Sequence, residues 1–250
     1  TIDSRKLEPG EVFVAIRGER FDGHAFLDEA QQRGASCLII ADPHALQRVP
    51  RFSVPVILVE ETTRALGALA RFHRKRIGRP VIGVTGSCGK TTTKDLIASI
   101  LATRMNVHKT SGNKNNLIGL PFSVLALNKT AELGIFELGM SLPFEIQRLA
   151  EILQPTAGLI TNIGDAHLEF MKSRKRVAKA KAALFLSLPK NGVAFVNSDD
   201  PYLKPYADQL LPCAVFTYSM KNEQADAYGA IIEDQALSGI QMQCHLKMPK

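Results

Sequence analysis

The sequence contains no tryptophan, only four cysteines and no long apolar run. Its longest apolar stretches, such as residues 37–41 and 54–59, are strand-sized, whereas a membrane-spanning helix needs about 20 apolar residues. The cysteines are scattered without a CxxC pair, which argues against a zinc site or a disulfide framework. No charged-then-apolar signal sequence opens the chain. We therefore expect a protein of the reducing cytoplasm, without a membrane partner.

Aromatic residues are also scarce, at 6% of the chain, while lysine and arginine outnumber the acidic residues by 31 to 24. The resulting net charge of +7 suits polyanions, either nucleic acids or phosphorylated small molecules. Because the basic residues are not gathered into one arm and few aromatics accompany them, an ordinary solvated surface explains most of these charges. We expect no nucleic-acid partner.

The 250 residues are enough for two ordinary domains, and the pattern changes near residue 78. Residues 1–78 predict a small α/β domain that ends in a basic, turn-prone linker at residues 74–80. The expected strands are residues 12–16, 37–41 and 54–60, and the expected helices are residues 25–33 and 62–75. The chain opens on Thr1, already in the pattern of folded sequence, so we expect this domain to lack its start.

Residues 79–250 predict a second α/β domain with a mostly parallel sheet, because strands alternate with crossover helices. The expected strands are residues 80–84, 135–138, 159–162 and 193–197, and the expected helices are residues 90–103, 144–153 and 175–188. A further alternating pattern at residues 237–248 has no finishing element after it. We expect this domain to be incomplete at its C-terminus.

The strongest motif is a glycine-rich turn between the apolar strand at residues 80–84 and the helix from residue 90, Gly86-Ser87-Cys88-Gly89-Lys90-Thr91-Thr92. Glycines allow backbone N–H groups to surround an anion, and the helix N-terminus adds the positive end of its dipole. Lys90 would reach the β- and γ-phosphates, and the hydroxyl of Thr91 or Thr92 would contact Mg²⁺. The strict GxxxxGK[ST] spacing fails by one position, since Val84 stands where a glycine would be. The alternative is a turn that merely links strand to helix.

Two further residues follow predicted strands. Glu137 closes a short apolar strand, and a carboxylate at the carboxyl end of a parallel strand faces the ligand crevice, where it suits Mg²⁺. It could instead be a surface glutamate. His167 lies just after the strand at residues 159–162, and a lone histidine is more often a structural group than a ligand. Asn197 follows another strand and could approach a nucleotide, although Asn197 to Asp200 is also typical of a plain turn.

Lys181 is predicted to point inward. A rotation of about 100° per residue places it on the apolar stripe of its helix, whereas Lys179 falls on the opposite face. A buried ammonium must pair or lose its proton, and a neutral amine can take up CO₂ as a carbamate. The alternative is a lysine whose stem packs while its head reaches water.

The loop Thr85-Gly-Ser-Cys-Gly-Lys-Thr-Thr-Thr-Lys94 resembles that of the Mur ligases, and the resemblance covers the whole chain. Other similar motifs are Asp3-Ser-Arg-Lys6, Phe21-Asp-Gly-His24, Gly112-Asn-Lys-Asn-Asn-Leu-Ile-Gly-Leu-Pro121 and Glu137-Leu-Gly139. Within the family they look most like the type that adds D-alanyl-D-alanine to UDP-N-acetylmuramoyl-tripeptide in peptidoglycan synthesis. One departure is Leu142-Pro-Phe-Glu145, since relatives usually carry a glycine just before the glutamate.

The resemblance implies ATP and Mg²⁺ as cofactors and a third, C-terminal domain that is absent here. It assigns the metal to Thr91, Glu137, His167 and a carbamoylated Lys181, fourteen residues after the histidine (181 − 167 = 14). It also implies that Asn116 lies near the γ-phosphate, with Asn113 or Asn115 as alternatives. In the N-terminal domain, Ser4 and Arg5 would contact the uridine diphosphate and Asp22 and His24 would frame it. Arg5 could also be an ordinary strand-edge charge.

The implied reaction is ATP-dependent amide ligation by a cytoplasmic monomer, through an acyl phosphate. Two other functions fit the same motifs. One is a neighbouring Mur ligase that adds a single amino acid, and the other is a phosphate-loop regulator that binds or hydrolyses ATP without ligase chemistry.

Overall fold

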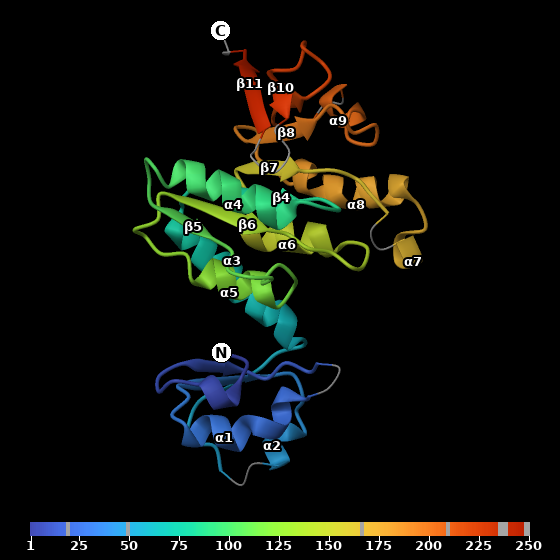
Figure 1. Cartoon of the computed structure of the whole chain (residues 1–250). Coiled ribbons are helices and arrows are strands. Elements are labelled where there is room, and N and C mark those ends of the chain that lie inside the picture. The colour runs from blue at the N-terminus through green and yellow to red at the C-terminus, as the bar shows by residue number, and fades with distance from the viewer. Residues whose placement is uncertain (19–20, 49–50, 166–167, 209–210, 235–239, 248–250) are drawn as a thin grey trace. The chain divides into compact units, whose positions relative to one another are not determined.

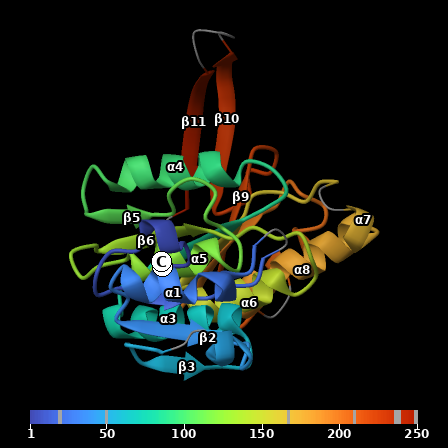
Figure 2. The ribbon, with the colours of Figure 1, turned by 90° about the horizontal axis from the view of Figure 1, so that it is seen from below.

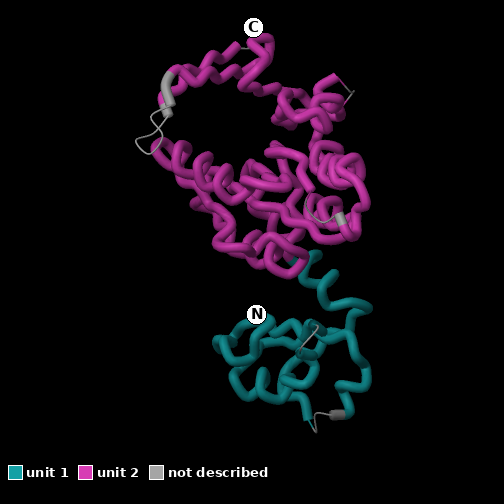
Figure 3. The backbone as a smooth tube through the Cα atoms, turned by 45° about the vertical axis from the view of Figure 1, so that its right-hand side comes forward, with its two compact units in different colours: residues 1–69 teal, residues 70–250 magenta. Residues whose placement is uncertain are grey.

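The structure, a computed structural model, describes residues 1–18, 21–48, 51–165, 168–208, 211–234 and 240–247. The chain divides into two compact units, residues 1–69 and 70–250 (Figure 3). This division falls within helix α3 (Thr62–Ile77), whereas the sequence placed the domain boundary after that helix, at residue 78. The assignment of domains to residues 1–78 and 79–250 stays a prediction.

The first unit is built on a sheet of three short parallel strands that are neighbours in chain order. They are β1 (Val12–Val14), β2 (Cys37–Ile40) and β3 (Val56–Leu58). The short helix η1 (Ser4–Lys6) precedes them, and η2 (Gly23–Phe26), α1 (Leu27–Gln32) and α2 (Ala45–Arg48) connect them. Phe13, Leu27 and Leu38 are almost fully buried in the core of this unit. The three predicted strands are therefore confirmed, each shorter than expected.

Two sequence predictions in this region were wrong in detail. The helix expected at residues 25–33 is a 3-10 turn followed by α1, because the Asp22 carboxylate accepts the His24 N–H and starts a turn earlier. The linker expected at residues 74–80 is helical up to Ile77. Arg74 explains this difference, since its buried Nε donates to the carbonyl of Leu153 at 2.9 Å and holds this turn of α3 in place.

The second unit contains an eight-stranded sheet, and the predicted mostly parallel arrangement is confirmed (Figures 1 and 2). Its strand order is β11-β10-β9-β8-β7-β4-β6-β5, and among the described residues only the pair β10–β11 is antiparallel. The strands are β4 (Val81–Thr85), β5 (Val107–Lys109), β6 (Leu133–Glu137), β7 (Ala157–Ile160), β8 (Val193–Asn197), β9 (Ala214–Ser219), β10 (Ala227–Asp234) and β11 (Ile240–Leu246).

Helices cover both faces of this sheet because its central strands are apolar on both sides. Val84 and Ile135 pack with Ala98 of α4 (Lys90–Leu101) on one face. The larger core cluster on the other face joins β4, β6 and β7 to helices α5 (Gly119–Leu125), α6 (Glu145–Leu153) and α8 (Arg174–Leu186). Two short helices, α7 (Leu168–Met171) and α9 (Pro205–Asp208), complete the unit.

The parallel order brings four loops to one edge of the sheet. Strands β4, β6, β7 and β8 end at Thr85, Glu137, Ile160 and Asn197, and their carboxyl ends meet at the same edge. In open α/β sheets ligands bind at this edge. Over the part of the chain that the structure describes, no helix has the length and apolarity to cross a membrane.

Candidate nucleotide-binding site

The glycine-rich turn lies between β4 and α4, at the carboxyl edge of the sheet. Gly86 has φ +153°, and a Cβ built there would lie 1.9 Å from Thr161 Oγ1, so no larger residue fits without displacement. Gly89 has φ +76°, a left-handed conformation, and immediately precedes the first residue of α4. Both glycines are thus required by backbone geometry, and they bring the N-terminus of α4 close to the end of β4.

The segment after β7 holds this loop. Asn162 accepts the Cys88 N–H on Oδ1 at 3.0 Å and donates from Nδ2 to the Cys88 carbonyl at 3.2 Å. The Ser87 N–H is donated to the Asn162 carbonyl, and Ser87 Oγ accepts the Gly164 N–H at 2.8 Å. The N–H groups of Ser87 and Cys88 are therefore used to fix the loop. The N–H groups of the first turn of α4 have no intrahelical acceptor and are the ones left for an anion.

Lys90 and Lys181 both reach the carbonyl oxygen of Gly86. Lys90 Nζ donates to it at 3.0 Å and Lys181 Nζ at 2.9 Å. Lys181 is 1% exposed, whereas Lys179 is exposed, so the expected inward and outward orientations are observed. Burial, and then the nearby charge of Lys90, lower the pKa of Lys181 to about 7. A neutral amine is therefore accessible at this position near neutral pH.

Glu137 lies opposite the start of α4 and is 2% exposed. Its Oε2 accepts the hydroxyl of Thr91 at 2.8 Å, and its Oε1 accepts Nδ2 of Asn115 at 2.8 Å. Thr91 and Thr92 are both exposed residues, so exposure does not distinguish them. Of the two threonines that the sequence offered, Thr91 is the one in contact with this carboxylate.

The asparagines near this site have different contacts. Asn115 pairs with Glu137, and its side chain lies against Gly139, where a Cβ would come within 2.8 Å of Asn115 Oδ1. Asn116 instead uses its Oδ1 to accept the N–H groups of Ile118 and Gly119 at the start of α5. Its predicted place beside a γ-phosphate stays a prediction.

The oxygen atoms of Glu137 and Thr91 are hard ligands and fit Mg²⁺, which usually takes one or two carboxylates and completes its shell with phosphate oxygens and water. Within the described residues, no group of three or more histidine, cysteine, aspartate or glutamate side chains could hold a metal ion. The predicted ligand His167 lies outside the described residues.

Asn197 and Asp200 support the loop after β7 from the end of β8. Asn197 Nδ2 donates to the Thr161 carbonyl at 2.9 Å. Asp200 is mostly buried, and its Oδ2 accepts the N–H of Ile163 at 2.6 Å. Sequence reasoning named Asn197 as a nucleotide contact but missed Thr161, Asn162 and Asp200 as supports. The sequence could have indicated these supports, because residues that follow neighbouring parallel strands meet at one edge of the sheet.

The residues predicted to bind a uridine diphosphate lie in the first unit. Asp22 accepts Nδ1 of the buried His24 at 2.6 Å, and His24 Nε2 accepts the Ala41 N–H at 2.9 Å. Burial opposes ionisation of Asp22, but hydrogen bonds from the main chain and ring of His24 and from Arg17 outweigh it and lower the pKa of Asp22 to about 2. His24 and Arg17 line a cavity of about 540 Å³ together with residues of 41–44 and 60–63.

Ser4 and Arg5 make contacts near the start of the chain. Ser4 Oγ donates to Glu29 Oε2 at 2.9 Å, and the exposed Arg5 pairs with Asp3 at 2.9 Å. Both ring nitrogens of His24 and the hydroxyl of Ser4 are thus used inside the unit, whereas the guanidinium of Arg5 remains open to solvent.

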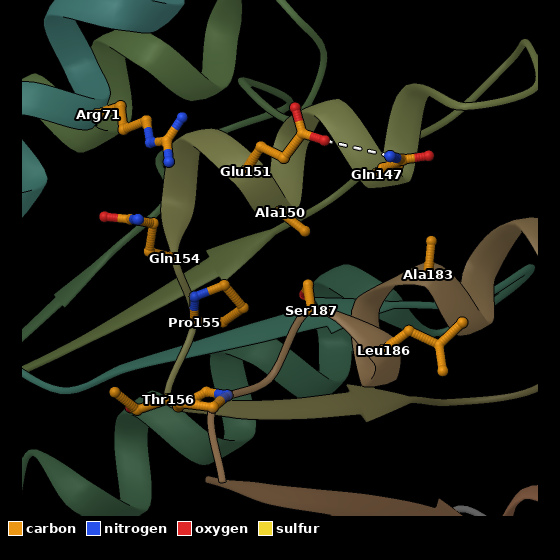
Figure 4. Close-up of a pocket in the computed structure, with 11 residues that line it drawn as sticks. Arg71, Gln147, Ala150, Glu151, Gln154, Pro155, Thr156, Ala183, Leu186 and Ser187 are labelled. Carbon is orange, nitrogen blue, oxygen red and sulfur yellow. Dashed lines mark hydrogen bonds between the residues drawn. The ribbon is translucent and has the colours of Figure 1, made fainter. Parts of the chain in front are cut away.

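A larger cavity, of about 620 Å³, lies at the other edge of the sheet (Figure 4). It is lined by the chain between α6 and β7, by the end of α8, and by Arg71 of α3. Because Thr156 and Pro189 precede β7 and β8, this cavity is at the amino ends of the strands, away from the glycine-rich loop. We do not associate it with the nucleotide.

Comparison with known proteins identifies two family segments. The family model described as Mur ligase middle domain matches residues 84–248, and the one described as Mur ligase family, catalytic domain, matches residues 1–74. UDP-N-acetylmuramoyl-tripeptide–D-alanyl-D-alanine ligase of Bacillus subtilis (strain 168) is 43% identical over 202 residues, 81% of this chain and 44% of that protein. The ligase of the same name in Synechocystis sp. is 39% identical over 241 residues, 96% of this chain and 52% of that protein.

Solved structures agree. MurF from Acinetobacter baumannii superposes with a TM-score of 0.88 and 30% identity, over 98% of this chain and 52% of that one. MurF ligase from Thermotoga maritima, in complex with ADP, has a TM-score of 0.83 and 33% identity, over 92% of this chain and 52% of that one. The chain spans about half the length of the curated relatives it matches. Since the middle-domain match includes the phosphate loop, Glu137 and Lys181, the chain belongs to the Mur ligase family and is most like the MurF type.

Proposed function

We propose that this chain carries the nucleotide site and the UDP-substrate unit of an ATP-dependent ligase that joins D-alanyl-D-alanine to UDP-N-acetylmuramoyl-tripeptide. The observation that carries the proposal is the convergence of Lys90, Lys181 and the Thr91–Glu137 pair on one glycine-rich loop. The printed names of relatives about 40% identical supply the substrates.

The loop would bind the phosphates of ATP. The first-turn N–H groups of α4, Gly89 and Lys90 form an electropositive cradle, and the Lys90 ammonium would exchange its carbonyl partners, Gly86 and Ser87, for β- and γ-phosphate oxygens. Cys88 and Thr92 border the same cradle. Asn116 would lie near the γ-phosphate, and Asn197 would approach the nucleotide from the end of β8.

Glu137 and Thr91 would hold Mg²⁺, with His167 and a carbamoylated Lys181 as proposed ligands of a second ion. When bound, such ions neutralise phosphate charge and allow a carboxylate to approach the triphosphate. The hydrogen bond between Thr91 and Glu137 supports the proposal, because it sets a hydroxyl and a carboxylate side by side before any ligand binds.

The carbamate proposal rests on the surroundings of Lys181. A neutral Lys181 Nζ would add to the carbon of CO₂, forming an N–C bond and releasing one proton, so that a neutral amine becomes an anion. Because the Lys90 charge disfavours an ammonium at this position, it would favour the carbamate anion there.

The reaction itself joins two anions and then an amine. The peptide carboxylate of the UDP-linked substrate attacks the γ-phosphate of ATP, which gives an acyl phosphate and ADP. The amine of D-alanyl-D-alanine then displaces phosphate and forms the amide. Lys90 and the backbone cradle align and neutralise the phosphates in the first step.

In the first unit, Arg5 and Ser4 would contact the uridine diphosphate, and Asp22 and His24 would frame its site. The placement rests on the N-terminal motifs, because the cavity that Arg17 and His24 line also contains Asp42, Glu60 and Glu61, and Arg17 already pairs with Asp22 at 2.9 Å. The proposed setting is the cytoplasm, with a monomer that has no nucleic-acid or membrane partner. The four free cysteines agree with a reducing compartment.

The test is ADP release by the complete protein with each substrate omitted in turn. Release that requires both UDP-N-acetylmuramoyl-tripeptide and D-alanyl-D-alanine supports the proposal. Mass analysis of products from UDP-muramoyl di- and tripeptides separates it from a ligase that adds a single amino acid to the shorter peptide. ATP hydrolysis that ignores both substrates would indicate a phosphate-loop regulator instead and would overturn it.

A further inference from the structure

Lys94 is a buried lysine that the reaction proposed above does not use. It stands three residues after Thr91 on α4, so the two side chains are neighbours on the helix, where Lys94 is buried and the exposed Thr91 reaches Glu137 of β6. Lys94 is 2% exposed. An ammonium in such a place is costly unless it is held by hydrogen bonds, so its retention requires a partner.

The partner is the main chain at the end of β5. Lys94 Nζ donates to the carbonyl of Thr110 at 2.9 Å, and its distance to Asp95 Oδ1 is 3.5 Å. Thr110 is itself 1% exposed, and its N–H is donated to the Ile135 carbonyl of β6 at 3.0 Å. Lys94 therefore connects the phosphate-loop helix to the point where β5 ends.

Thr110 in turn contacts Glu137. The hydroxyl Oγ1 of Thr110 accepts the main-chain N–H of Glu137 at 3.2 Å, while the Glu137 carboxylate accepts the Thr91 hydroxyl at 2.8 Å. These hydrogen bonds form a closed network, which links α4 to the end of β5, β5 to β6, and β6 back to α4. Thr110 also begins the segment that leads to Asn115, which holds the other carboxylate oxygen of Glu137.

We propose that Lys94 is a positioning residue, which fixes Thr110 and through it the main chain and carboxylate of Glu137 relative to Thr91. The proposal rests on the proposed function, in which Glu137 and Thr91 hold Mg²⁺ beside the nucleotide. Lys94 touches neither the nucleotide nor the metal ligands directly. Its effect is therefore on the metal-dependent part of nucleotide binding.

The test compares Lys94→Met with Lys109→Met on this chain. Lys109 is the matched control, because its half-exposed ammonium pairs with the same Asp95 at 2.6 Å, whereas the hydrogen bond to the Thr110 carbonyl comes from Lys94. The affinity for ADP is measured by calorimetry with and without Mg²⁺. We expect Lys94→Met to reduce the Mg²⁺-dependent gain in affinity about tenfold or more, the usual effect of losing an outer-shell support, and to leave metal-free ADP binding nearly unchanged. Lys109→Met should behave as the wild type.

A second measurement needs no ligand. Amide hydrogen exchange at Glu137 and at residues 110–115, in metal-free and nucleotide-free protein, should be faster in Lys94→Met and unchanged in Lys109→Met. Thr110→Val, which removes only the hydroxyl acceptor, should have a similar effect. Because both variants break the same hydrogen-bond network, their effects on Mg²⁺-dependent ADP affinity and on amide exchange should be less than additive in the double variant. This keeps the test decisive if Lys94→Met folds poorly.

The outcomes separate the two proposals. Equal loss of ADP affinity with and without Mg²⁺, or unchanged exchange at Glu137, would overturn the role of Lys94. A wild-type chain whose ADP affinity does not respond to Mg²⁺ would overturn the metal site of the proposed function. In that case, faster amide hydrogen exchange in Lys94→Met would still support the proposal that Lys94 positions Glu137.

Discussion

Lys90 and Lys181 donate to the same carbonyl oxygen, that of Gly86, although α4 and α8 lie on opposite faces of the sheet. At the end of β4, side chains from both layers therefore meet. Two ammonium groups so close repel each other, which is one reason why the pKa of Lys181 falls to about 7.

Removal of the Lys90 ammonium should weaken ATP binding without unfolding the chain. Lys90 is partly exposed and its only hydrogen bonds among the described residues are to loop carbonyls, so Lys90→Met should lower ATP affinity at least tenfold. Calorimetry measures this, and thermal unfolding checks the fold. Lys190→Met, an exposed lysine in the turn before β8, is the control. Unchanged ATP affinity in Lys90→Met would contradict the assigned phosphate contact.

Ligase activity of the complete protein should depend on CO₂ through Lys181. Lys181→Ala should lose most activity, and added acetate or formate should restore part of it by filling the anionic position. Bicarbonate should stimulate wild-type protein that has been depleted of CO₂. The exposed Lys179 lies on the same helix, so Lys179→Ala is the matched control. Full activity in Lys181→Ala would rule out the carbamate.

The free energy of unfolding should depend on pH through the ionisation of Lys181. Its pKa is about 7 in the folded state and near the model-compound value of 10.5 in the unfolded state. Between these values only the unfolded chain binds the proton, so the free energy of unfolding should rise with pH, by at most about 1.4 kcal/mol per unit. Below pH 7 both states are protonated and this contribution is flat.

Urea denaturation in CO₂-free buffer at several pH values between 6 and 10 measures the effect. Lys181→Met lacks the titrating group, so its stability relative to wild type should be greatest near pH 6 and should decline as pH rises. Lys179→Met should follow the wild-type profile. Parallel profiles for wild type and Lys181→Met would show that the lysine titrates normally in the folded state.

The two loop glycines should differ in their tolerance of a methyl group. In Gly86→Ala the new Cβ meets Thr161 Oγ1 at 1.9 Å, with the Thr161 backbone N at 3.1 Å, so the loop must move. In Gly89→Ala no heavy atom lies within 4 Å, and only the left-handed backbone, worth about 1–2 kcal/mol, opposes the change. Gly86→Ala should therefore reduce both stability and ADP affinity more than Gly89→Ala does, as measured by denaturation and calorimetry. The reverse order would contradict this loop geometry.

Sequence patterns predicted the parts of this structure that depend on local periodicity. Residues 193–197 form β8 as expected, and helical spacing separated the buried Lys181 from the exposed Lys179. The supports of the site were missed, because Asn162, Thr110 and Lys94 act through contacts between loops and helices far apart in the chain. Strands β5 and β9 and helix α5 were also missed, since short or mixed segments such as Val107–Lys109 show no period of their own.

Residues 142–145, where the sequence departs from the family pattern, contain a residue with an unusual backbone conformation. Phe144 takes the backbone conformation of a glycine, with φ +68°, and its ring is largely exposed. Glu145 accepts the N–H groups of Ser141 and Leu142 and so stabilises the turn that holds Phe144. This glutamate explains how a bulky residue is kept there at a cost of about 1–2 kcal/mol.

The order of strands in the large sheet also governs how the chain can assemble during translation. β4 has β6 and β7 as neighbours, yet β6 begins at Leu133 and β7 ends at Ile160. The apolar strand that leads into the phosphate loop is thus synthesised early, has no partner until residue 137 has emerged from the ribosome, and lacks its second partner until residue 160 has emerged. The three strands of the first unit pair in chain order and can associate as they emerge. Nascent chains should consequently fold in two stages, with the interval between them as the period of greatest exposure to aggregation.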